Sequence, residues 1–135
     1  HIFYADGYYG YDDAMYVAIR TLGVLATGTD TLADFRETLP VVLNTPELRF
    51  TCAEDRKFVV PNEVHERLKR EGADVNATDG VRVNTADGWW LLRASNTQDV
   101  LVARCEALNA AGLGRLKDAL ASQLAASGVE LPAGF

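Results

Sequence analysis

A run of small polar residues between two strand-like segments has the composition of an anion-binding loop. Arg93 offers a planar guanidinium that can bind two phosphate oxygens at once. Ser95, Asn96 and Thr97 each add a short hydrogen-bonding side chain that loses little entropy when it is fixed. Small residues also let the main chain curl, so that its N–H groups form an anion-binding nest. The residues alone nevertheless favour the plainer interpretation, a polar connection whose side chains bond their own turn.

Other groups of residues have both a chemical and a structural interpretation. Asp12 and Asp13 could form a paired-carboxylate acid/base site, but at a helix start they are more simply a cap that interacts with the helix dipole. His65 lies among charged helix formers, which favours a solvated surface histidine over a catalytic one. Arg56 and Lys57 could extend the basic lining of a cleft, although a solvated turn is the commoner position of such residues.

The segments on either side of the polar run predict antiparallel strands. Trp89 to Leu92 and Val100 to Ala107 read as strands, and Asp79-Gly80 and Asp87-Gly88 are hairpin-type dipeptides. A further strand is predicted at 48–52, and helices are predicted at 60–70 and from 113 to 124. We therefore expect an α+β domain, in which two helices cover one face of an antiparallel sheet of about four strands.

The first forty residues predict a smaller unit. Strand-like residues open the chain, one helix follows Asp12-Asp13 up to Gly28, and another follows Thr31 up to Pro40. One strand and two helices cannot bury their apolar faces alone, so we expect this unit to be incomplete. The predicted division is a remnant at 1–39, a connector at 40–47 that is bracketed by prolines, and a second domain at 48–135.

The composition limits the kinds of partner that the chain is expected to bind. Its 135 residues carry a net charge of -6, so the long-range field repels nucleic acid and anionic membrane surfaces. The two cysteines, Cys52 and Cys105, lie in apolar segments without zinc-site spacing and are expected to be buried thiols. No apolar run approaches the ~20 residues of a membrane span, which leaves a reducing cytoplasm as the default location.

The residues also resemble one protein family along nearly the whole chain. Asp87–Gln98 (DGWWLLRASNTQ), followed by Arg104–Ala107 (RCEA), resembles the C-terminal domain of the phosphomannomutase/phosphoglucomutase family. Gly7–Ala14 (GYYGYDDA) is similar to the end of that family's third, α/β domain, and Asn44–Leu48 (NTPEL) is similar to its inter-domain connector. Asp55–Phe58 (DRKF) also fits, in the family's order. The resemblance implies a TATA-box-binding-protein-like fold for the second domain.

The resemblance gives the polar run a definite role. It implies that the loop holds the phosphate of a bound sugar through Arg93, Ser95, Asn96 and Thr97, and that it lets the substrate bind in two opposite orientations. Mutases that act on glucosamine phosphate usually carry Ser-Gly-Thr in this loop, so Ser-Asn-Thr favours mannose or glucose phosphates. The family often has proline where this chain has Asp99, and we expect the Asp99 carboxylate to point away from the phosphate.

Catalysis in this family uses residues that the chain does not contain. Such enzymes interconvert hexose 1-phosphates and 6-phosphates through a phosphoserine and a bisphosphate intermediate, with Mg²⁺ held in an Asp-rich loop. Neither loop is present in the sequence. The resemblance thus implies that magnesium binds outside this chain, that the chain alone is inactive, and that the other mutase domains are its partners in the same polypeptide.

The start of the chain carries one more candidate. His1 matches a family histidine that could act as general acid or base near the hexose, whereas a terminal residue without a role is the alternative. A Gly-Glu-Met-Ser-Gly sugar-recognition loop should lie immediately before it, so we expect the chain to be a fragment. The second hypothesis for the whole chain is a non-catalytic α+β module that binds a protein or a phosphorylated ligand.

Overall fold

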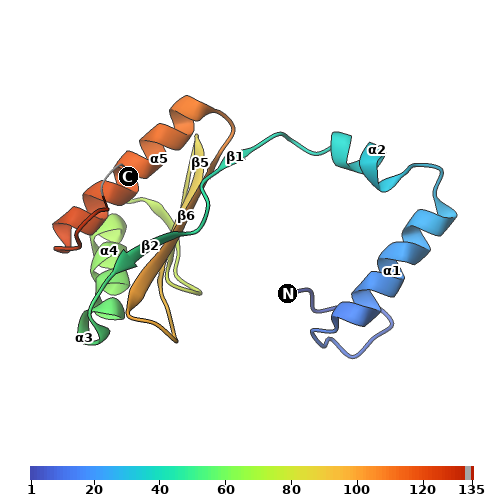
Figure 1. Ribbon diagram of the computed structural model, residues 1–135, viewed down its shortest axis with the longest axis horizontal. Coiled ribbons are helices and arrows are strands. Elements are labelled where there is room, and N and C mark those ends of the chain that lie inside the picture. Colours follow the sequence, from blue (N-terminus) through green and yellow to red (C-terminus); the bar gives the residue numbers. More distant parts are fainter. Residues whose placement is uncertain (133–134) are drawn as a thin grey trace. The chain divides into compact units, whose positions relative to one another are not determined.

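The computed structural model describes residues 1–132 and 135, which form two compact units, His1–Pro40 and Val41–Phe135. The two units are traced in Figure 1, and each is described by itself. None of the helices in the described residues is both long enough and apolar enough to span a membrane.

The first unit consists of two capped helices and a short irregular start. Helix α1 (Ala14–Thr27) begins after Asp13, whose side chain accepts a hydrogen bond from the Tyr16 N–H, and it ends at Gly28. The Tyr8 hydroxyl also donates to the Asp13 carboxylate and holds its pKa below the usual value. The capping interpretation of this acidic pair is therefore confirmed at Asp13. The predicted opening strand is reduced to one bridge between Phe3 and Asp12.

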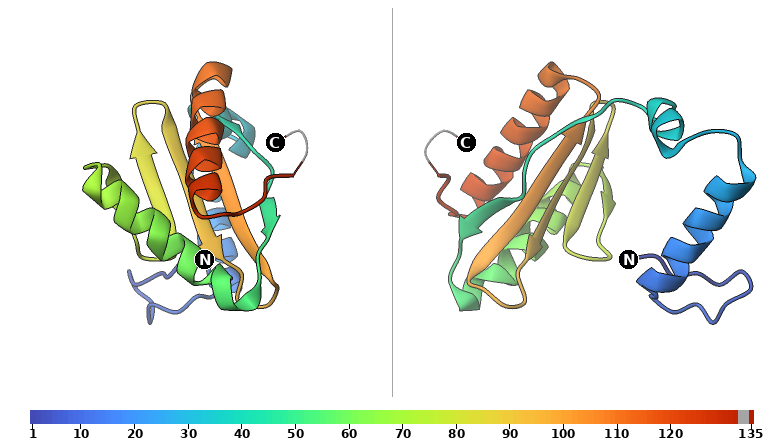
Figure 2. Two further views of the ribbon diagram at one scale, coloured as in Figure 1. Left: turned by 90° about the vertical axis from the view of Figure 1, so that its left-hand side faces the viewer. Right: turned by 45° about the vertical axis from the view of Figure 1, so that its right-hand side comes forward.

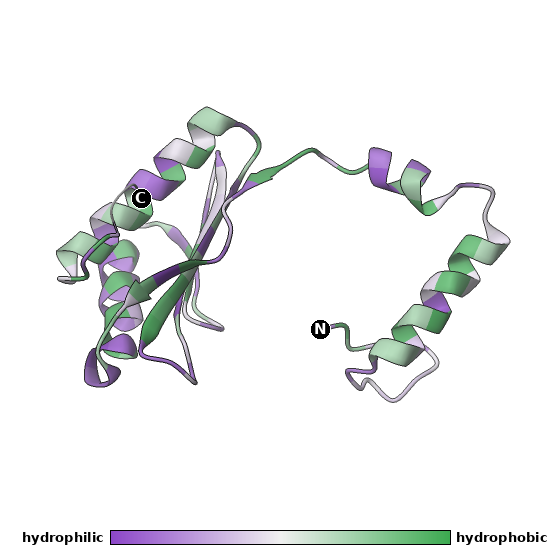
Figure 3. Ribbon diagram, in the orientation of Figure 1, coloured by the Kyte–Doolittle hydropathy of each residue, from purple (hydrophilic) through white to green (hydrophobic). Residues whose placement is uncertain are grey.

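Helix α2 (Leu32–Glu37) begins with the predicted capping box. The Thr31 hydroxyl accepts from the Asp34 N–H, while the Asp34 carboxylate accepts from the Thr31 N–H. Neither α1 nor α2 contains a buried residue, and Figure 3 shows α1 mostly in the hydrophobic colours. Local capping thus fixes where these helices start, but the unit has no core of its own.

The second unit is built on an antiparallel sheet. Its strands are β1 (Leu43–Asn44), β2 (Leu48–Thr51), β3 (Asp74–Asn76), β4 (Val81–Thr85), β5 (Gly88–Ala94) and β6 (Val100–Ala107). They follow the order β1-β6-β5-β4-β3, and β2 also pairs with β6. The sheet therefore has more strands than the four predicted, because residues 43–44, expected within a connector, pair with the end of β6.

The helices cover one face of this sheet. Helix α3 (Glu54–Lys57) replaces the turn expected there, and it is followed by α4 (Val59–Arg70) and α5 (Ala110–Ala126). Both views in Figure 2 show α4 and α5 on the same face. The core between helices and sheet includes Phe50, Val64, Trp90, Leu92, Leu101, Cys105, Leu116 and Leu120. The predicted α+β fold class is confirmed, and both cysteines are buried free thiols.

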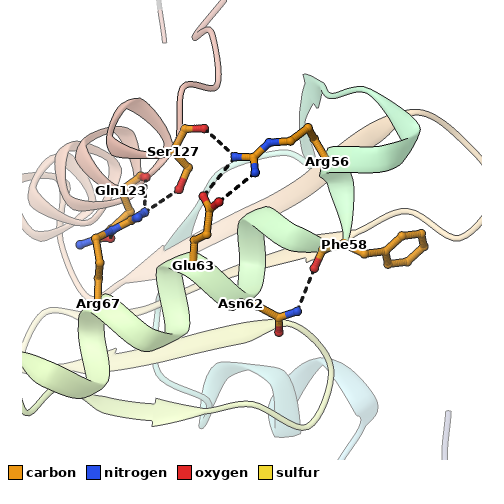
Figure 4. Close-up of polar contacts among 7 residues, drawn as sticks. All are labelled: Arg56, Phe58, Asn62, Glu63, Arg67, Gln123 and Ser127. Carbon is orange, nitrogen blue, oxygen red and sulfur yellow. Dashed lines mark hydrogen bonds and ion pairs between the residues drawn. The ribbon is translucent and has the colours of Figure 1, made fainter.

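Two arginines tie α3 and α4 to the end of α5 (Figure 4). Arg56 binds both carboxylate oxygens of Glu63 at 2.8 and 3.1 Å, and it donates to the Ser127 carbonyl at 3.2 Å. Arg67 donates to the Gln123 carbonyl and to the Ser127 hydroxyl, at 2.9 and 2.7 Å. A cation at the C-terminus of a helix bonds the free carbonyl groups there and interacts favourably with the helix dipole. These contacts fix α3, which lies beside the polar loop, relative to the rest of the domain.

Candidate functional site

The polar loop connects the two longest strands of the sheet. Strand β5 continues through Arg93 to Ala94, and β6 begins at Val100, so the connection itself is Ser95 to Asp99. Arg93 is paired with Val102 across the two strands. Arg93 therefore belongs to the rigid strand end and not to the flexible part of the loop, which restricts where its guanidinium can reach.

The loop residues curl at the end of the hairpin. The Ser95 N–H donates to the Val100 carbonyl at 3.0 Å, and the buried Ser95 hydroxyl accepts from the Thr97 N–H at 3.4 Å. Asn96 and Thr97 follow with exposed side chains. Neither of these two side chains bonds another described residue. The loop thus combines one fixed serine with two residues whose donors face solvent.

Arg93 points to the open face of the sheet. Trp90 and Leu92 face the helices, so the alternation of side chains along β5 places Arg93 on the opposite side. Its half-buried guanidinium takes part in none of the ion pairs found among the described residues. Among the four cations Arg49, Arg56, Lys57 and Arg93, only Arg93 has no partner among the described carboxylates.

Trp89 does not lie under the loop. It pairs with Glu106 at the far end of β5 from Arg93. The Arg82 guanidinium stacks 4.5 Å above its ring, and its Nε1 donates to Glu106 at 3.1 Å. Trp89 therefore stabilises the open face by a cation–π contact and is not a sugar-stacking platform for this loop.

The base of the loop is bonded to α3 and β2. Lys57 Nζ donates to the Gln98 carbonyl at 3.1 Å and lies 3.6 Å from the Asp99 carboxylate. The Cys52 N–H donates to the Asp99 carbonyl at 3.0 Å. The carboxylate of Glu54 also accepts from Lys57, which raises the pKa of the lysine and keeps it charged. The Lys57 side chain is 2% exposed, so a solvated turn is the wrong interpretation for it.

Arg49 approaches the loop from the open face. It is paired with Val102, as Arg93 is, so the two arginines flank the same residue in one row across three strands. Arg49 donates to the Gln98 side chain and is paired with Glu47 at 2.6 Å. The sequence shows no sign of these contacts, because strand pairing brings Arg49 to the loop across 49 residues and the docking of α3 brings Lys57 there across 41.

The loop offers free donors to an anion, while the nearby carboxylates of Glu54 and Asp99 are held by Lys57. The side chains of Arg93, Asn96 and Thr97 have no hydrogen-bond or ion-pair partner among the described residues, whereas Lys57 stands between Glu54 and Asp99. A guanidinium and several small donors on neighbouring residues match the charge and the hydrogen-bonding needs of a phosphate.

Comparison with known proteins places the chain in a family. The family model for the C-terminal domain of phosphoglucomutase/phosphomannomutase matches residues 47–123. The chain belongs to this family. The matched range contains the loop, both strands that flank it, and the Lys57 contacts at its base. The resemblance expected from the sequence motifs is therefore confirmed.

The relatives of this mutase-family chain are considerably longer than it is. A phosphomannomutase/phosphoglucomutase of Pseudomonas putida is 37% identical over 92% of the chain, and that of Pseudomonas aeruginosa is 35% identical over all of it. A phosphoglucomutase/phosphomannomutase family protein of Burkholderia thailandensis has a solved structure with a TM-score of 0.80 at 36% identity, over 98% of the chain. The chain spans between 27% and 29% of the length of these three proteins.

Two further expectations concern His1 and the metal of the mutase family. His1 belongs to the first unit, where its Nδ1 contacts the Asp12 carboxylate and its side chain is 80% exposed. Its assignment as an acid or base stays a prediction. Within residues 1–132 and 135, no three His, Cys, Asp or Glu side chains gather as metal ligands do.

His65 differs from the surface histidine expected from the sequence. Its imidazole is half-buried on α4, and its Nδ1 is buried without a hydrogen-bond partner among the described residues. The charged residues around His65 in the sequence were therefore a poor guide to its exposure. Nothing places it near the polar loop, so the preference for a non-catalytic role is unchanged.

Proposed function

We propose that this chain is the substrate-phosphate-binding part of a hexose-phosphate mutase that interconverts mannose or glucose 1-phosphates and 6-phosphates. Its loop holds the phosphate that is not being transferred, through Arg93, Ser95, Asn96 and Thr97. The names of the relatives support the substrate class, since the Pseudomonas proteins are phosphomannomutase/phosphoglucomutases. The Ser-Asn-Thr sequence of the loop supports the same sugars over glucosamine phosphate.

The unneutralised guanidinium of Arg93 is the observation that carries this proposal. In a chain of net charge -6, a phosphate must be held by local donors, because the distant field repels it. Arg93 is fixed in a strand beside the exposed donors of Asn96 and Thr97, and it is not engaged by any described carboxylate. Because the backbone of Arg93 is already fixed in the strand, only its side chain has to be ordered when the anion binds.

The chemistry of the mutase would be carried out by the rest of the protein. A phosphoserine would donate and recover the phosphoryl group, and magnesium would neutralise the developing charge. This domain would act as a lid that closes over the active site and excludes water. The chain by itself is then inactive, and its binding of a phosphosugar is weak, because the contacts to the sugar ring and to the second phosphate are lost.

Titration of the 135-residue chain with mannose 1-phosphate and glucose 1-phosphate, followed by amide NMR, tests the proposal. We expect shifts centred on residues 93–97, with a dissociation constant on the order of 1 mM. Arg93→Ala should abolish them, whereas Arg70→Ala, which removes the same charge from the end of α4, should leave them unchanged. Equal shifts with unphosphorylated mannose, or a response that survives Arg93→Ala, would contradict a phosphate site.

A further inference from the structure

Lys57 is the most deeply buried charged side chain of the second unit. It is 2% exposed and comes from α3, a helix held in place by the Arg56 contacts to Glu63 and Ser127. Burying an ammonium group is costly unless it is paired and hydrogen-bonded. Its charge is matched within the domain by the carboxylates of Glu54 and Asp99.

The polar contacts of Lys57 lie in its own helix and in the polar loop. Glu54 belongs to its own helix, and the other two contacts are the Gln98 carbonyl and the Asp99 carboxylate, both in the polar loop. Lys57 is not part of the hydrophobic core cluster. Its side chain therefore joins α3 to the C-terminal half of the loop, immediately after Asn96 and Thr97.

We propose that Lys57 is a positioning residue for the phosphate loop: it fixes Gln98 and Asp99, and it compensates the Asp99 charge that would otherwise repel the phosphate. This inference rests on the proposed function, since it concerns the same site. Lys57 lies on the helix side of the sheet and Arg93 on the open face, so the lysine acts through the loop and is not itself a phosphate ligand.

The physical basis has two parts that a variant can separate. The hydrogen bond from Lys57 to the Gln98 carbonyl fixes the backbone that follows Thr97. A displacement of ~1 Å in a group that positions a ligand can reduce function as much as 100-fold. Removing the ammonium would also leave two carboxylates, Glu54 and Asp99, beside an anion site without their cation. Both effects lower phosphate affinity, but only the second depends on the charge of Asp99.

The test compares variants of the 135-residue chain by amide NMR titration with mannose 1-phosphate. Lys57→Met keeps the aliphatic stem, and the two carboxylates that lose their cation, Glu54 and Asp99, are each 67% exposed, so solvent can stabilise their charge. We expect its affinity to fall about tenfold, with shift differences in the free protein confined to α3 and residues 96–99. Lys69→Met, the same charge change at the far end of α4, should bind as the unmodified chain does. The double variant Lys57→Met/Asp99→Asn should recover part of the lost affinity.

Each outcome separates this inference from the proposed function. If the unmodified chain shows no shifts at residues 93–97, the phosphate site itself fails. If the unmodified chain binds and Lys57→Met binds equally well, only the role of Lys57 is wrong. Lys57→Gln, which keeps a donor for the Gln98 carbonyl, serves as the second variant. Should neither variant give a dispersed spectrum, Lys57 supports the fold and the positioning role is overturned. No recovery in the double variant would overturn the charge compensation.

Discussion

At the scale of single residues, pairing decides which charged groups remain available to a ligand. Arg49, Arg56 and Lys57 are each matched by a carboxylate, whereas Arg93 is not. A cation already bonded to a carboxylate must give up that contact before it can bind a phosphate. The free charge of Arg93 therefore counts for more than the number of basic residues near the loop.

Gly88 illustrates how one residue fixes the hairpin that carries the loop. Its φ of 141° lies in a region that side chains rarely adopt, and a Cβ there would lie 2.1 Å from the Glu106 carbonyl oxygen. We expect Gly88→Ala to lower the unfolding free energy by about 2–4 kcal/mol, through backbone strain and displacement of β6. Urea denaturation measures it, with Gly114→Ala, where a Cβ meets open space, as the control. Equal stability of the two variants would contradict the close approach.

The thiol of Cys105 should give the stability of the chain a dependence on alkaline pH. Burial raises its pKa to about 11, so it stays protonated in the folded state while the unfolded thiol, with a pKa of about 8.5, ionises. The unfolded state then loses protons first, and stability falls as the pH rises through this window. Between pH 7 and 10 we expect a loss of roughly 1–2 kcal/mol from this group.

Urea denaturation under reducing conditions at pH 7 and 10 measures this effect. The variant Cys105→Ala lacks the thiol, so its stability should decline less over the same range, even though the smaller side chain makes it less stable at pH 7. Parallel declines in the two proteins would show that the Cys105 thiol is not protected by burial.

At the scale of elements, the turn between β4 and β5 is joined to the start of α5. Arg115 binds the Asp87 carboxylate with both Nε and a terminal nitrogen, and the Leu108 N–H donates to the Asp87 carbonyl at 3.3 Å. Asp87 lies against Gly112 in the first turn of α5, where the helix dipole stabilises a negative charge. One carboxylate thus connects the hairpin that carries the loop to the helix that covers it.

The Asp87 contact should make part of the stability depend on acidic pH. The hydrogen bonds from Arg115 lower the pKa of Asp87, so the stabilisation is complete above the ordinary carboxylate pKa and is lost as the pH falls through the lowered value. We expect Asp87→Asn to lower the urea midpoint at pH 7, and the difference from the unmodified chain to close towards pH 2. A difference that persists at pH 2 would point to packing and not to charge.

At the scale of the whole molecule, the two units differ in what stabilises them. All members of the buried core cluster lie between Phe50 and Val129, within the second unit. The first unit has capped helices but no buried helical residue. Helices of this length are marginal in water without a packed face, so capping alone does not stabilise them.

A shortened chain that begins at Val41 tests this difference. Because the core lies entirely after that residue, we expect residues 41–135 to unfold cooperatively and to keep the dispersed amide spectrum of the sheet. Leu92→Ala in this shortened chain should cost about 2–5 kcal/mol, since the side chain is fully buried. Loss of the dispersed spectrum on truncation would show that the first forty residues are needed for the fold.

Much of the local structure could be predicted because its causes are local. The cap at Asp13, the capping box of Thr31 and the strands around the loop depend on residues a few positions apart. The helix at Glu54–Lys57 was expected to be a turn, because four residues carry no periodicity. The burial of Lys57 was missed as well, since its loop partner, Gln98, lies 41 positions away in the chain.

The sequence by itself determined the chemical composition of the loop, the strands on either side of it and the family to which the chain belongs. Only the tertiary structure decided which charges are free. Strand pairing brings Arg49 to Gln98, and the docking of α3 brings Lys57 to Asp99, while Arg93 has no partner among the carboxylates that the structure describes. The physical reason is range: hydrogen bonds and ion pairs act over a few ångströms, and which groups come that close depends on how the whole domain packs.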